Sequence, residues 1–338
     1  MNKPLVSVII PIYNCESTIE ETIQSVLNQN YGIVEIILVE NGSTDNTLES
    51  ICKYVNGHSV KLFKSNVKSA SFSRNLGFKF SSGDYILFLD SDDILDSNYI
   101  NEHIRFLELK NFSSSIITIG NFDFYVDEKV IKNCSIENKR HNNRIELLNS
   151  LFYSIDDFMF QTTCFLVPRS FLEIYEWKNY LTLDDDGDFI FSILVKYEQV
   201  KILTDAKYYY RKKHSNKTLS KTRNKRSLMS ALVCQENKFN LAKEIVDFNI
   251  DQLIINQLKI MKDFYNYDYI GAPWPLIEGH FLDPAGNLRR VGNGGFSFRS
   301  KKLLEVPTKE YVPFVATTHG DYYKHNNTAC CAEDVVIC

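Results

Sequence analysis

The stretch Tyr85-Ile-Leu-Phe-Leu-Asp-Ser-Asp-Asp93 determines how the rest of the chain is interpreted. Its five leading apolar residues are typical of a strand buried on both faces, and four polar residues follow at once. Such a strand ends at one edge of a parallel sheet, where Asp90, Ser91 and Asp92 would emerge. Carboxylates there are suitable ligands for Mg²⁺ or Mn²⁺ beside a diphosphate. A surface turn is the alternative, because Asp-x-Asp also occurs by chance.

Strand and helix patterns alternate in the residues before this stretch. Strands are predicted at Leu5 to Pro11, Val34 to Val39 and Val60 to Phe63, and a helix at about Ala70 to Phe80. The turn at Ser43 to Asp45 is predicted to cap a further helix. The alternation predicts an α/β fold, Rossmann-like, with a mainly parallel central sheet and helices on both faces. Three polar clusters, Tyr13-Asn14, Glu40-Asn41 and Asp90 to Asp93, would then meet at one edge of that sheet.

The alternation loosens after Asp93, and three domains are predicted along the chain. Strand candidates at Ser115 to Ile119, Thr162 to Val167 and Lys207 to Arg211 predict mixed pairing in the second part of the sheet. The predicted domains are residues 1–220 with the α/β fold, a helical connector at 221–264 and a smaller, glycine-rich α+β module at 265–338. The chain ends four residues after Asp334, so this last module is predicted to be cut short.

Composition excludes several classes of protein. A net charge of −4 over 338 residues argues against nucleic-acid binding, which favours a basic surface. The eight cysteines form no Cys-x-x-Cys pair, and neither a secretory start nor a membrane-spanning apolar run is present, so we predict a cytoplasmic protein. The basic run from Arg211 to Arg226 has two interpretations: a solvated face, or a phosphate or peripheral membrane contact.

Four motifs, in this order, resemble the signature of family 2 glycosyltransferases with the GT-A fold. They are Val8-Ile-Ile-Pro-Ile-Tyr-Asn14, Val39-Glu-Asn-Gly-Ser-Thr-Asp45, Ser73-Arg-Asn-Leu-Gly77 and Leu89-Asp-Ser-Asp-Asp93. The resemblance covers roughly residues 4 to 220 and is dense up to Asp93.

The resemblance implies a binding site for a nucleotide-sugar donor. Pro11 and Tyr13 would pack on the base and ribose, and Glu40 and Asn41 would read the edge of the base. Asn41 stands where the family commonly has an acidic residue, but its amide oxygen can still accept a hydrogen bond. The remaining residues implied for this site are Arg74 near the nucleotide, Asp90 near the ribose with Ser91 beside it, and Asp92 on a Mn²⁺ or Mg²⁺ ion.

The segment Leu183-Asp-Asp-Asp-Gly-Asp-Phe189 resembles the family's Glu-Asp-x-x-aromatic motif. With Phe189 as the anchor, Asp185 replaces the glutamate and Asp186 takes the proton from the acceptor hydroxyl. The register within Asp184 to Asp188 stays open by one residue. Clustered carboxylates repel one another, so at least one raised pKa is expected. A solvated acidic helix start is the alternative interpretation.

Two further segments resemble known sequences. Tyr208 to His214, with the residues after it, resembles the family's basic closing loop, in which Arg211 or His214 would contact phosphate or metal; an exposed loop histidine is the alternative. Val291-Gly-Asn-Gly-Gly-Phe-Ser-Phe-Arg299 and Glu333-Asp334 resemble an uncharacterised domain found beside, or as, other glycosyltransferases. An acceptor-binding or structural role and a partial second transferase both stay open for this module.

Together these features predict a metal-dependent, inverting transferase of the hexosyltransferase class. Asp186 would deprotonate a hydroxyl of a glycan, lipid or protein acceptor, which then displaces the nucleotide diphosphate, UDP by default, from the sugar. A catalytically inactive nucleotide-sugar or glycan-binding protein is the alternative, motivated by Asn41 and the altered acid motif. A nucleotidyltransferase would show a glycine-rich basic loop near its first strand, which Pro11 to Ser17 lacks.

Overall fold

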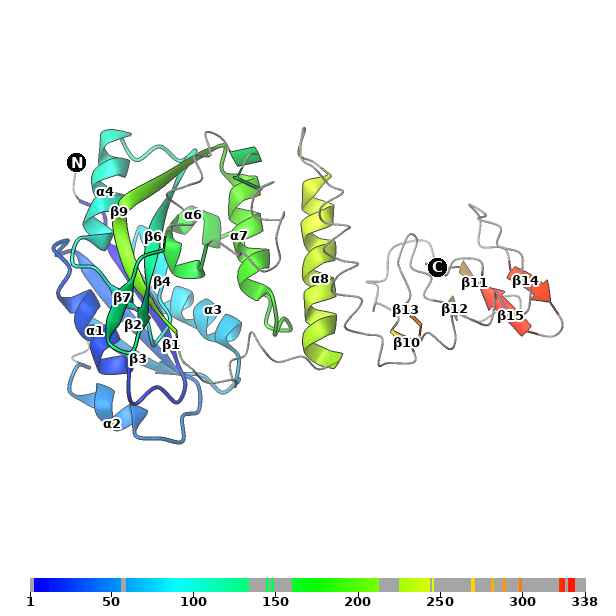
Figure 1. The fold of residues 1–338 in the computed structure, drawn as a ribbon, viewed down its shortest axis with the longest axis horizontal. Helices are drawn as coiled ribbons and strands as arrows, with labels where there is room; N and C mark the ends of the chain where they lie inside the picture. The colour runs from blue at the N-terminus through cyan, green and yellow to red at the C-terminus, as the bar shows by residue number, and fades with distance from the viewer. Residues whose placement is uncertain are drawn as a thin grey trace.

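The computed structural model describes residues 3–55, 59–133, 144–145, 147–148, 160–212, 225–243 and 245, and six short strands between residues 269 and 331 (Figure 1). The strands of the large sheet are β1 Val6–Ile12, β2 Val34–Glu40, β3 Val60–Lys64, β4 Tyr85–Phe88, β5 Ile94–Leu95, β6 Ile116–Val126, β7 Lys129–Ile131, β8 Phe165–Pro168 and β9 Gln199–Arg211. The helices are α1 Ile19–Leu27, α2 Thr47–Cys52, α3 Ala70–Phe80, α4 Tyr99–Leu109, the 3₁₀ turn η1 Thr162–Cys164, α6 Arg169–Leu172, α7 Asp185–Lys196 and α8 Lys225–Ala242.

The strand order of the sheet is β3-β2-β1-β4-β8-β6-β9-β5, with β7 paired to β6. The strands β3, β2, β1 and β4 are all parallel, whereas β8 runs antiparallel to both β4 and β6. The predicted α/β fold, parallel at first and mixed later, is confirmed. The chain leaves β1 for β2 on one side, and β4 returns to the other side of β1. Such a reversal of strand order creates a crevice at the carboxyl ends of the strands, where α/β proteins bind ligands.

Two sequence predictions about strands differ from the structure. Residues 162–164, predicted as the start of a strand, form η1, because the Thr163 carbonyl accepts the buried Tyr99 hydroxyl at 2.6 Å instead of a sheet partner. Strand β9 begins at Gln199 rather than Lys207, and it pairs with β6 across a register shift between Ile119 and Asn121. The first part of β9 is largely exposed, so it lacks the apolar pattern by which strands are recognised.

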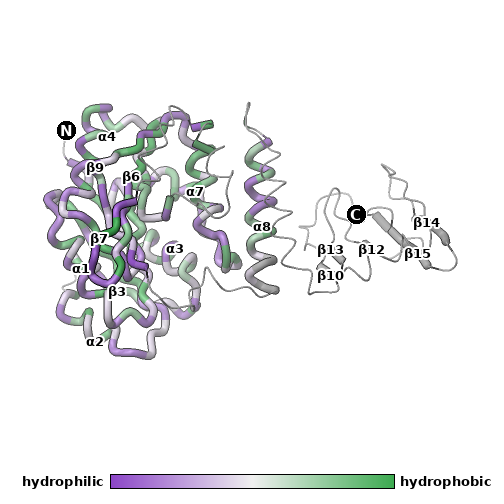
Figure 2. Tube along the Cα trace, viewed as in Figure 1, coloured by the Kyte–Doolittle hydropathy of each residue, from purple (hydrophilic) through white to green (hydrophobic). Residues whose placement is uncertain are grey.

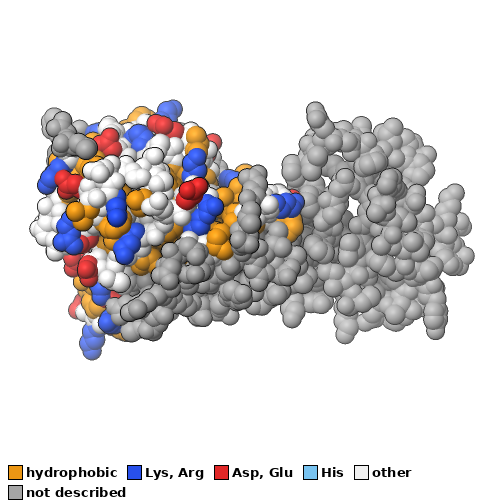
Figure 3. Space-filling view, turned by 90° about the horizontal axis from the view of Figure 1, so that it is seen from above, with side chains coloured by type: hydrophobic (Ala, Val, Ile, Leu, Met, Phe, Trp, Pro, Cys, Tyr) orange, Lys and Arg blue, Asp and Glu red, His pale blue; other side chains and the backbone are white. Residues whose placement is uncertain are grey.

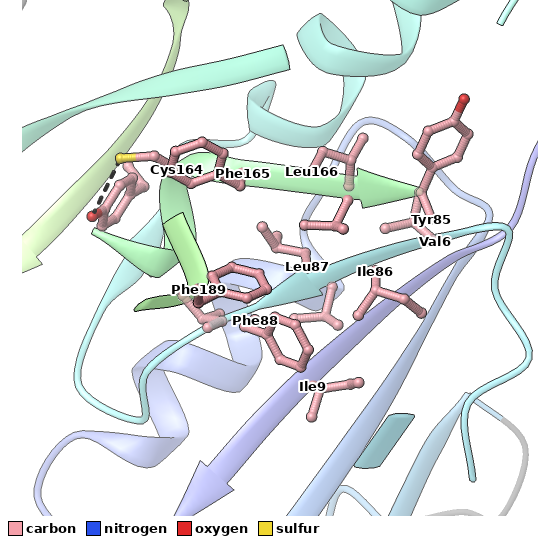
Figure 4. Packing of buried hydrophobic residues seen from close by; sticks show 14 of the residues in the cluster. Val6, Ile9, Tyr85, Ile86, Leu87, Phe88, Cys164, Phe165, Leu166 and Phe189 are labelled. Carbon is pink, nitrogen blue, oxygen red and sulfur yellow. Dashed lines mark hydrogen bonds between the residues drawn. The ribbon is translucent and has the colours of Figure 1, made fainter. Parts of the chain in front are cut away.

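The core lies between the sheet and its covering helices. Figure 2 shows hydrophobic segments running through the sheet, and Figure 4 shows Ile9 of β1, Phe88 of β4 and Leu166 of β8 in one buried cluster with Phe189 of α7. The rings of Phe88 and Phe189 meet edge to face with centroids 5.7 Å apart. This contact fixes the first turns of α7 against the end of β4.

Helix α3 lies unusually close to the sheet, and Gly77 makes that approach possible. A Cβ atom at position 77 would lie 2.4 Å from Ile9 Cγ2 of β1 and 3.3 Å from Val39 Cγ2 of β2. These distances are shorter than van der Waals contact, so only glycine fits without a shift of the helix. Arg74 lies one turn earlier on α3, so Gly77 also sets its depth in the protein.

The remaining described elements lie towards the C-terminus. The short strands β10 Tyr269–Ile270, β11 Phe281–Leu282, β12 Leu288–Arg289, β13 Phe298–Arg299, β14 Tyr322–His325 and β15 Thr328–Cys331 form the antiparallel pairs β10 with β13, β11 with β12, and β14 with β15. Helix α8 falls within the predicted connector at 221–264. Apart from residues 243 and 245, the rest of that connector lies outside the described residues, as do the Gly-Asn-Gly-Gly-Phe run and Glu333-Asp334. The proposed domain boundaries stay predictions.

Two observations bear on cysteine chemistry and on the membrane. Cys15, Cys52, Cys164 and Cys234 are free thiols. None of the helices in the described ranges is both long and apolar enough to cross a membrane. In the view of Figure 3, acidic and basic side chains lie intermixed over the described surface, so both signs of charge occur on that face.

We expect Gly77→Ala to lower the free energy of unfolding by about 1–3 kcal/mol, because overpacking against Ile9 outweighs the ~1 kcal/mol gained in helix propensity. Gly32→Ala is the matched control, since a Cβ there meets nothing within 4 Å. It should change stability by less than about 0.5 kcal/mol. Urea denaturation followed by circular dichroism measures both. A Gly77→Ala variant as stable as the wild type would contradict the close packing of α3 on β1.

Candidate functional site

The loops that follow β1 and β2 are joined to each other at the crevice. The Asn14 amide oxygen accepts the Thr44 backbone N–H at 2.8 Å, and the Asn14 backbone N–H donates to the Ser43 hydroxyl at 3.1 Å. Asn14 adopts a left-handed φ of 46°, which asparagine tolerates better than most residues. Tyr13 is 47% exposed, and the Lys68 ammonium lies 5.6 Å from its ring centroid. One aromatic face is therefore available to a planar ligand at the mouth of the crevice.

The Glu40 and Asn41 side chains both hold backbone in this structure. The buried Glu40 carboxylate accepts the Ser43 N–H. The Asn41 amide, oriented by its hydrogen bonds, donates to the Val67 carbonyl and accepts the Ser69 N–H at 3.2 Å. These contacts shape the loops, and the reading of a base edge by Glu40 and Asn41 stays a prediction. The N-cap of α2 is Asn46, which lies just after the predicted Ser43 to Asp45 and makes no side-chain capping bond; one residue earlier, the Asp45 carboxylate accepts the N–H of Thr47, the first residue of α2, at 3.1 Å.

Arg74 of α3 joins the acid that follows β4 to the acids that begin α7. Its guanidinium lies 3.2 Å from Asp90 Oδ1, 3.4 Å from Asp185 Oδ2 and 3.4 Å from Asp186 Oδ1. The arginine side chain is only 5% exposed, and its guanidinium carbon lies 4.4 Å from the centroid of the Trp177 ring. Sequence resemblance implied a place near the nucleotide, and the structure shows Arg74 buried beneath the carboxylates.

The charges at this junction shift one another's pKa values. Burial alone would lower the pKa of Arg74, but the charges of Asp186, Asp90 and Asp185 raise it above its ordinary value. Desolvation raises the pKa of Asp185 to about 6, with repulsion from Asp186 adding to it and Arg74 opposing it. The pKa of Asp90 is also raised to about 6, first by desolvation, with Arg74 opposing and with Asp186 and Asp92 contributing. At least one raised carboxyl pKa was predicted from the clustering, and the structure agrees.

The four acids of the segment 184–188 have different environments. Asp188 is 1% exposed and forms an ion pair with Lys178 at 2.9 Å, while the Asp184 carboxylate lies 2.5 Å from Lys238 Nζ. Asp185 accepts the Ser71 hydroxyl at 3.0 Å and Asp186 accepts the Thr162 hydroxyl at 2.8 Å. A solvated acidic helix start is therefore wrong for this segment. Of these four acids, Asp185 and Asp186 are the two whose carboxylates pair with Arg74, at 3.4 Å each. Their catalytic role and the register of the motif stay predictions.

The turn after β4 is fixed mainly through its backbone. The Ser91 carbonyl accepts the hydroxyls of Thr18 and Thr22 of α1 at 3.0 and 3.1 Å. Arg211 Nε donates to the Asp92 carbonyl at 2.8 Å, and the guanidinium also pairs with Glu21. Ser91 and Arg211, implied as donor-binding residues, thus brace this turn. His214 lies outside the described residues.

Asp92 is the residue that the sequence resemblance implies as the ligand of a divalent metal. Among the described residues no group of three or more His, Cys, Asp or Glu side chains is placed to bind a metal ion. Asp92 is half-buried at the end of β4, whereas Asp90 is paired with Arg74 and Asp93 is 1% exposed. Mg²⁺ commonly takes one or two carboxylates together with substrate phosphates. The donor set therefore fits a metal that arrives with a diphosphate, rather than a cage made by the protein alone.

Sequence reasoning missed Trp177 and Lys238, which shape this site, and it named Asp93 only as part of the polar cluster after β4. Trp177 is 2% exposed, stacks on Phe189 with ring centroids 4.3 Å apart, and lies against Arg74. Asp93 is buried, its pKa is raised above the ordinary value first by desolvation, and it accepts the Arg211 N–H at 3.0 Å. Lys238 of α8 pairs with Asp184. Trp177 is one of only two tryptophans, a weak signal of its role, whereas no local pattern marks Lys238.

We expect Asp185→Asn to raise the free energy of unfolding by about 1–3 kcal/mol above pH 7. The folded-state pKa of about 6 exceeds the ordinary 3.8, so the charged form is disfavoured in the folded protein. The wild type gains stability from protonating this group below pH 3.8 and loses that gain as pH rises through 6. The advantage of the variant should therefore vanish near pH 4 in pH-dependent urea titrations.

The same substitution at Asp188, three residues later, should have the opposite effect on the free energy of unfolding. Asp188→Asn removes the charge partner of Lys178 and is expected to lower stability by about 1–3 kcal/mol at pH 7. If both variants lost stability equally at pH 8, the electrostatic crowding of Asp185 would be refuted.

The comparisons with known proteins identify the family and the fold. The sequence matches the family described as "Glycosyl transferase family 2" over residues 7–175, and one described as "Protein of unknown function (DUF5672)" over residues 213–338. It is 39% identical over 126 residues to an "Uncharacterized glycosyltransferase" of Haemophilus influenzae, covering 37% of this chain and 49% of the relative. It is 40% identical over 104 residues to the Escherichia coli protein WfaP, a "UDP-Glc:alpha-D-GlcNAc-diphosphoundecaprenol beta-1,3-glucosyltransferase", covering 31% of this chain and 41% of the relative. These matches span about half, or less, of the length of those relatives.

The fold itself has a solved counterpart. The structure superposes on Staphylococcus aureus TarS 1-349 in complex with UDP-GlcNAc with a TM-score of 0.60, at 19% identity, over 78% of this chain and 73% of that one. At this identity the likeness shows the fold. Since the family match spans half of the 338 residues and the GT-A fold agrees with it, the chain belongs to glycosyl transferase family 2.

Proposed function

We propose that the protein transfers a sugar from a nucleotide diphosphate sugar, with UDP as the favoured nucleotide, to a hydroxyl of a glycan, lipid or protein acceptor. The observation that carries the proposal is the Arg74 junction, in which one guanidinium lies within 3.4 Å of Asp90, Asp185 and Asp186. Asp90 pairs with one terminal nitrogen of the guanidinium, and Asp185 and Asp186 pair with the other, which supports a donor-side acid and a base that lie close together. Relatives described with UDP-Glc and UDP-GlcNAc support the choice of UDP.

On the donor side, the crevice offers groups suited to a nucleotide. The exposed Tyr13 ring at the end of β1 would stack on the base, with Pro11 beside it, and Glu40 and Asn41 would border the base edge. Asp90 would lie near the ribose. For Arg211 to bind a phosphate it would have to leave Glu21 and the Asp92 carbonyl, so binding and a movement of this arginine would be coupled.

A divalent ion is proposed at Asp92. When bound, Mn²⁺ or Mg²⁺ would neutralise charge on the departing diphosphate. The chain's own contribution is to hold the Asp92 turn rigid, through the Thr18 and Thr22 hydroxyls on Ser91 and the Arg211 bond to the Asp92 carbonyl.

On the acceptor side, we propose Asp186 as the general base. Its side chain is 36% exposed, compared with 22% for Asp185, which is held by both Ser71 and Arg74. Asp186 would take the proton of the acceptor hydroxyl while that oxygen attacks the anomeric carbon and the nucleotide diphosphate leaves. A single displacement of this kind inverts the anomeric centre, and Asp185 would support Asp186 through their shared arginine.

The donor site is tested by thermal unfolding against a panel of nucleoside diphosphates, with and without Mn²⁺. We expect UDP with Mn²⁺ to stabilise the wild type by about 2.7 kcal/mol at a hundred times its dissociation constant, and Asp92→Ala to lose the metal-dependent part. Asp205→Ala, on the exposed part of β9, is the control and should respond like the wild type. Absence of a shift with every nucleotide would refute the donor site.

Turnover is tested by Asp186→Asn. The variant should keep nucleotide binding but lose transfer by about 10²- to 10⁴-fold, the usual contribution of a general base. The assay measures nucleotide diphosphate release with and without acceptor. If the wild type binds nucleotide sugar yet transfers nothing to any acceptor tested, and Asp186→Asn is indistinguishable from it, the alternative of a binding protein gains support.

A further inference from the structure

Helix α8 holds the backbone immediately before the candidate catalytic acids. The Ser230 hydroxyl accepts the N–H groups of Thr182 at 2.7 Å and Leu183 at 3.0 Å, and it donates to the Leu183 carbonyl at 2.9 Å. Ser230 is only 5% exposed. A single buried hydroxyl therefore fixes two successive peptide units that lead into Asp185 and Asp186.

The next residue, Asp184, is held by α8 through its carboxylate. Asp184 has a φ of 63°, a left-handed conformation that residues other than glycine seldom adopt. Its Oδ2 accepts Lys238 Nζ at 2.5 Å and Gln235 Nε2 at 3.2 Å. Lys238 is only 2% exposed, and a buried ammonium group requires a charged or strongly polar partner. The pair therefore keeps Asp184 in the conformation from which α7 starts.

The close approach continues into the first turn of α7. A Cβ on Gly187 would lie 2.0 Å from Asp184 Oδ1 and 2.7 Å from Lys238 Nζ, so the pair occupies the space that a side chain would take. Asn237 of α8 also donates to the buried Asp188 carboxylate at 3.0 Å. Figure 1 shows α7 and α8 side by side, as these contacts require. Polar groups of α8 thus hold Asp184, just before Asp185 and Asp186, and Asp188, two residues after them.

We propose that Lys238 and Ser230 are positioning residues for the transfer reaction. They set the direction in which α7 presents Asp185 and Asp186 to the acceptor. The role of Asp186 as base in this inference rests on the proposed function. Displacement of a catalytic group by about 1 Å is enough to reduce turnover by 10²-fold, so distant contacts of this kind control rate. Helix α8 lies within residues 213–338, which match a family of unknown function. Positioning of the acids on α7 would be a role for this helix.

The test compares Lys238→Met with Lys243→Met in the full chain. Both changes remove an ammonium and keep an unbranched apolar stem, but Lys243 is exposed just past the end of α8, where its ammonium contacts Asn240 Oδ1 at 3.4 Å and lies 4.6 Å from the Phe239 ring centroid. We expect Lys238→Met to lower kcat by about 10- to 100-fold with the donor KM within twofold of wild type. Lys243→Met should match the wild type. Ser230→Ala, a milder change, should lower kcat in the same way if Lys238→Met does not fold.

A double variant separates charge positioning from loss of packing. In Lys238→Met the Asp184 carboxylate loses its cation and is driven towards solvent, which displaces the start of α7. Adding Asp184→Asn removes that charge and leaves an amide that can still bond to Gln235. We therefore expect kcat of the double variant to recover several-fold relative to Lys238→Met. A double variant no better than the single one would overturn the charge-based positioning.

Hydrogen–deuterium exchange gives a readout that does not depend on turnover. Peptides covering residues 183–189 should exchange faster in Lys238→Met than in Lys243→Met, with the strands of the sheet unchanged. Unchanged exchange together with unchanged kcat would overturn the inference, as would parallel loss of nucleotide binding and turnover. If the wild type transfers no sugar at all, the proposed function fails, and exchange in this segment alone decides whether α8 positions the acids.

Discussion

The arrangement of the site depends on one buried cation shared by three carboxylates. Arg74 is 5% exposed, and its guanidinium lies within 3.4 Å of acids on two separate elements, the turn after β4 and the start of α7. Burying a charged group is unfavourable unless opposite charges surround it, so neither group of acids can move away without leaving the buried guanidinium short of negative charge. The supporting features follow from this constraint: Gly77 lets α3 lie deep enough, and Trp177 closes the open face of the guanidinium.

The same crowding that organises the acids also works against stability. Asp90 and Asp185 both have a pKa raised to about 6, which means that the folded protein holds them charged near neutral pH at a free-energy disadvantage. Functional sites commonly retain such disadvantages because the reaction requires the charged groups. The two raised pKa values belong to Asp90 and Asp185, which lie beside the proposed base Asp186 and share its arginine. The electrostatic disadvantage therefore comes from the confinement of several acids around one arginine.

Much of the fold could be predicted from sequence because its signals are local. The helix at Ala70 to Phe80 has the predicted bounds, and the apolar runs of β1 and β4 identify the centre of the sheet. The role of Arg74 could not be predicted in this way, since its partners at positions 90 and 185 come from different elements and only the folded sheet brings them together. The η1 turn was missed for a related reason: the Tyr99 hydroxyl that captures its carbonyl is distant in the chain. Local patterns locate elements, whereas long-range polar contacts decide what the elements do.

The two family matches end and begin at positions that do not coincide with the limits of the candidate site. The match to glycosyl transferase family 2 ends at residue 175, before the acid pair at 185 and 186, and the second match begins at residue 213 and includes α8. Yet Ser230 and Lys238 are 5% and 2% exposed, and their partners Leu183 and Asp184 immediately precede that pair. Helix α8 thus packs directly against the start of α7, and a chain divided at residue 220 would remove Lys238 and leave Asp184 without its cation.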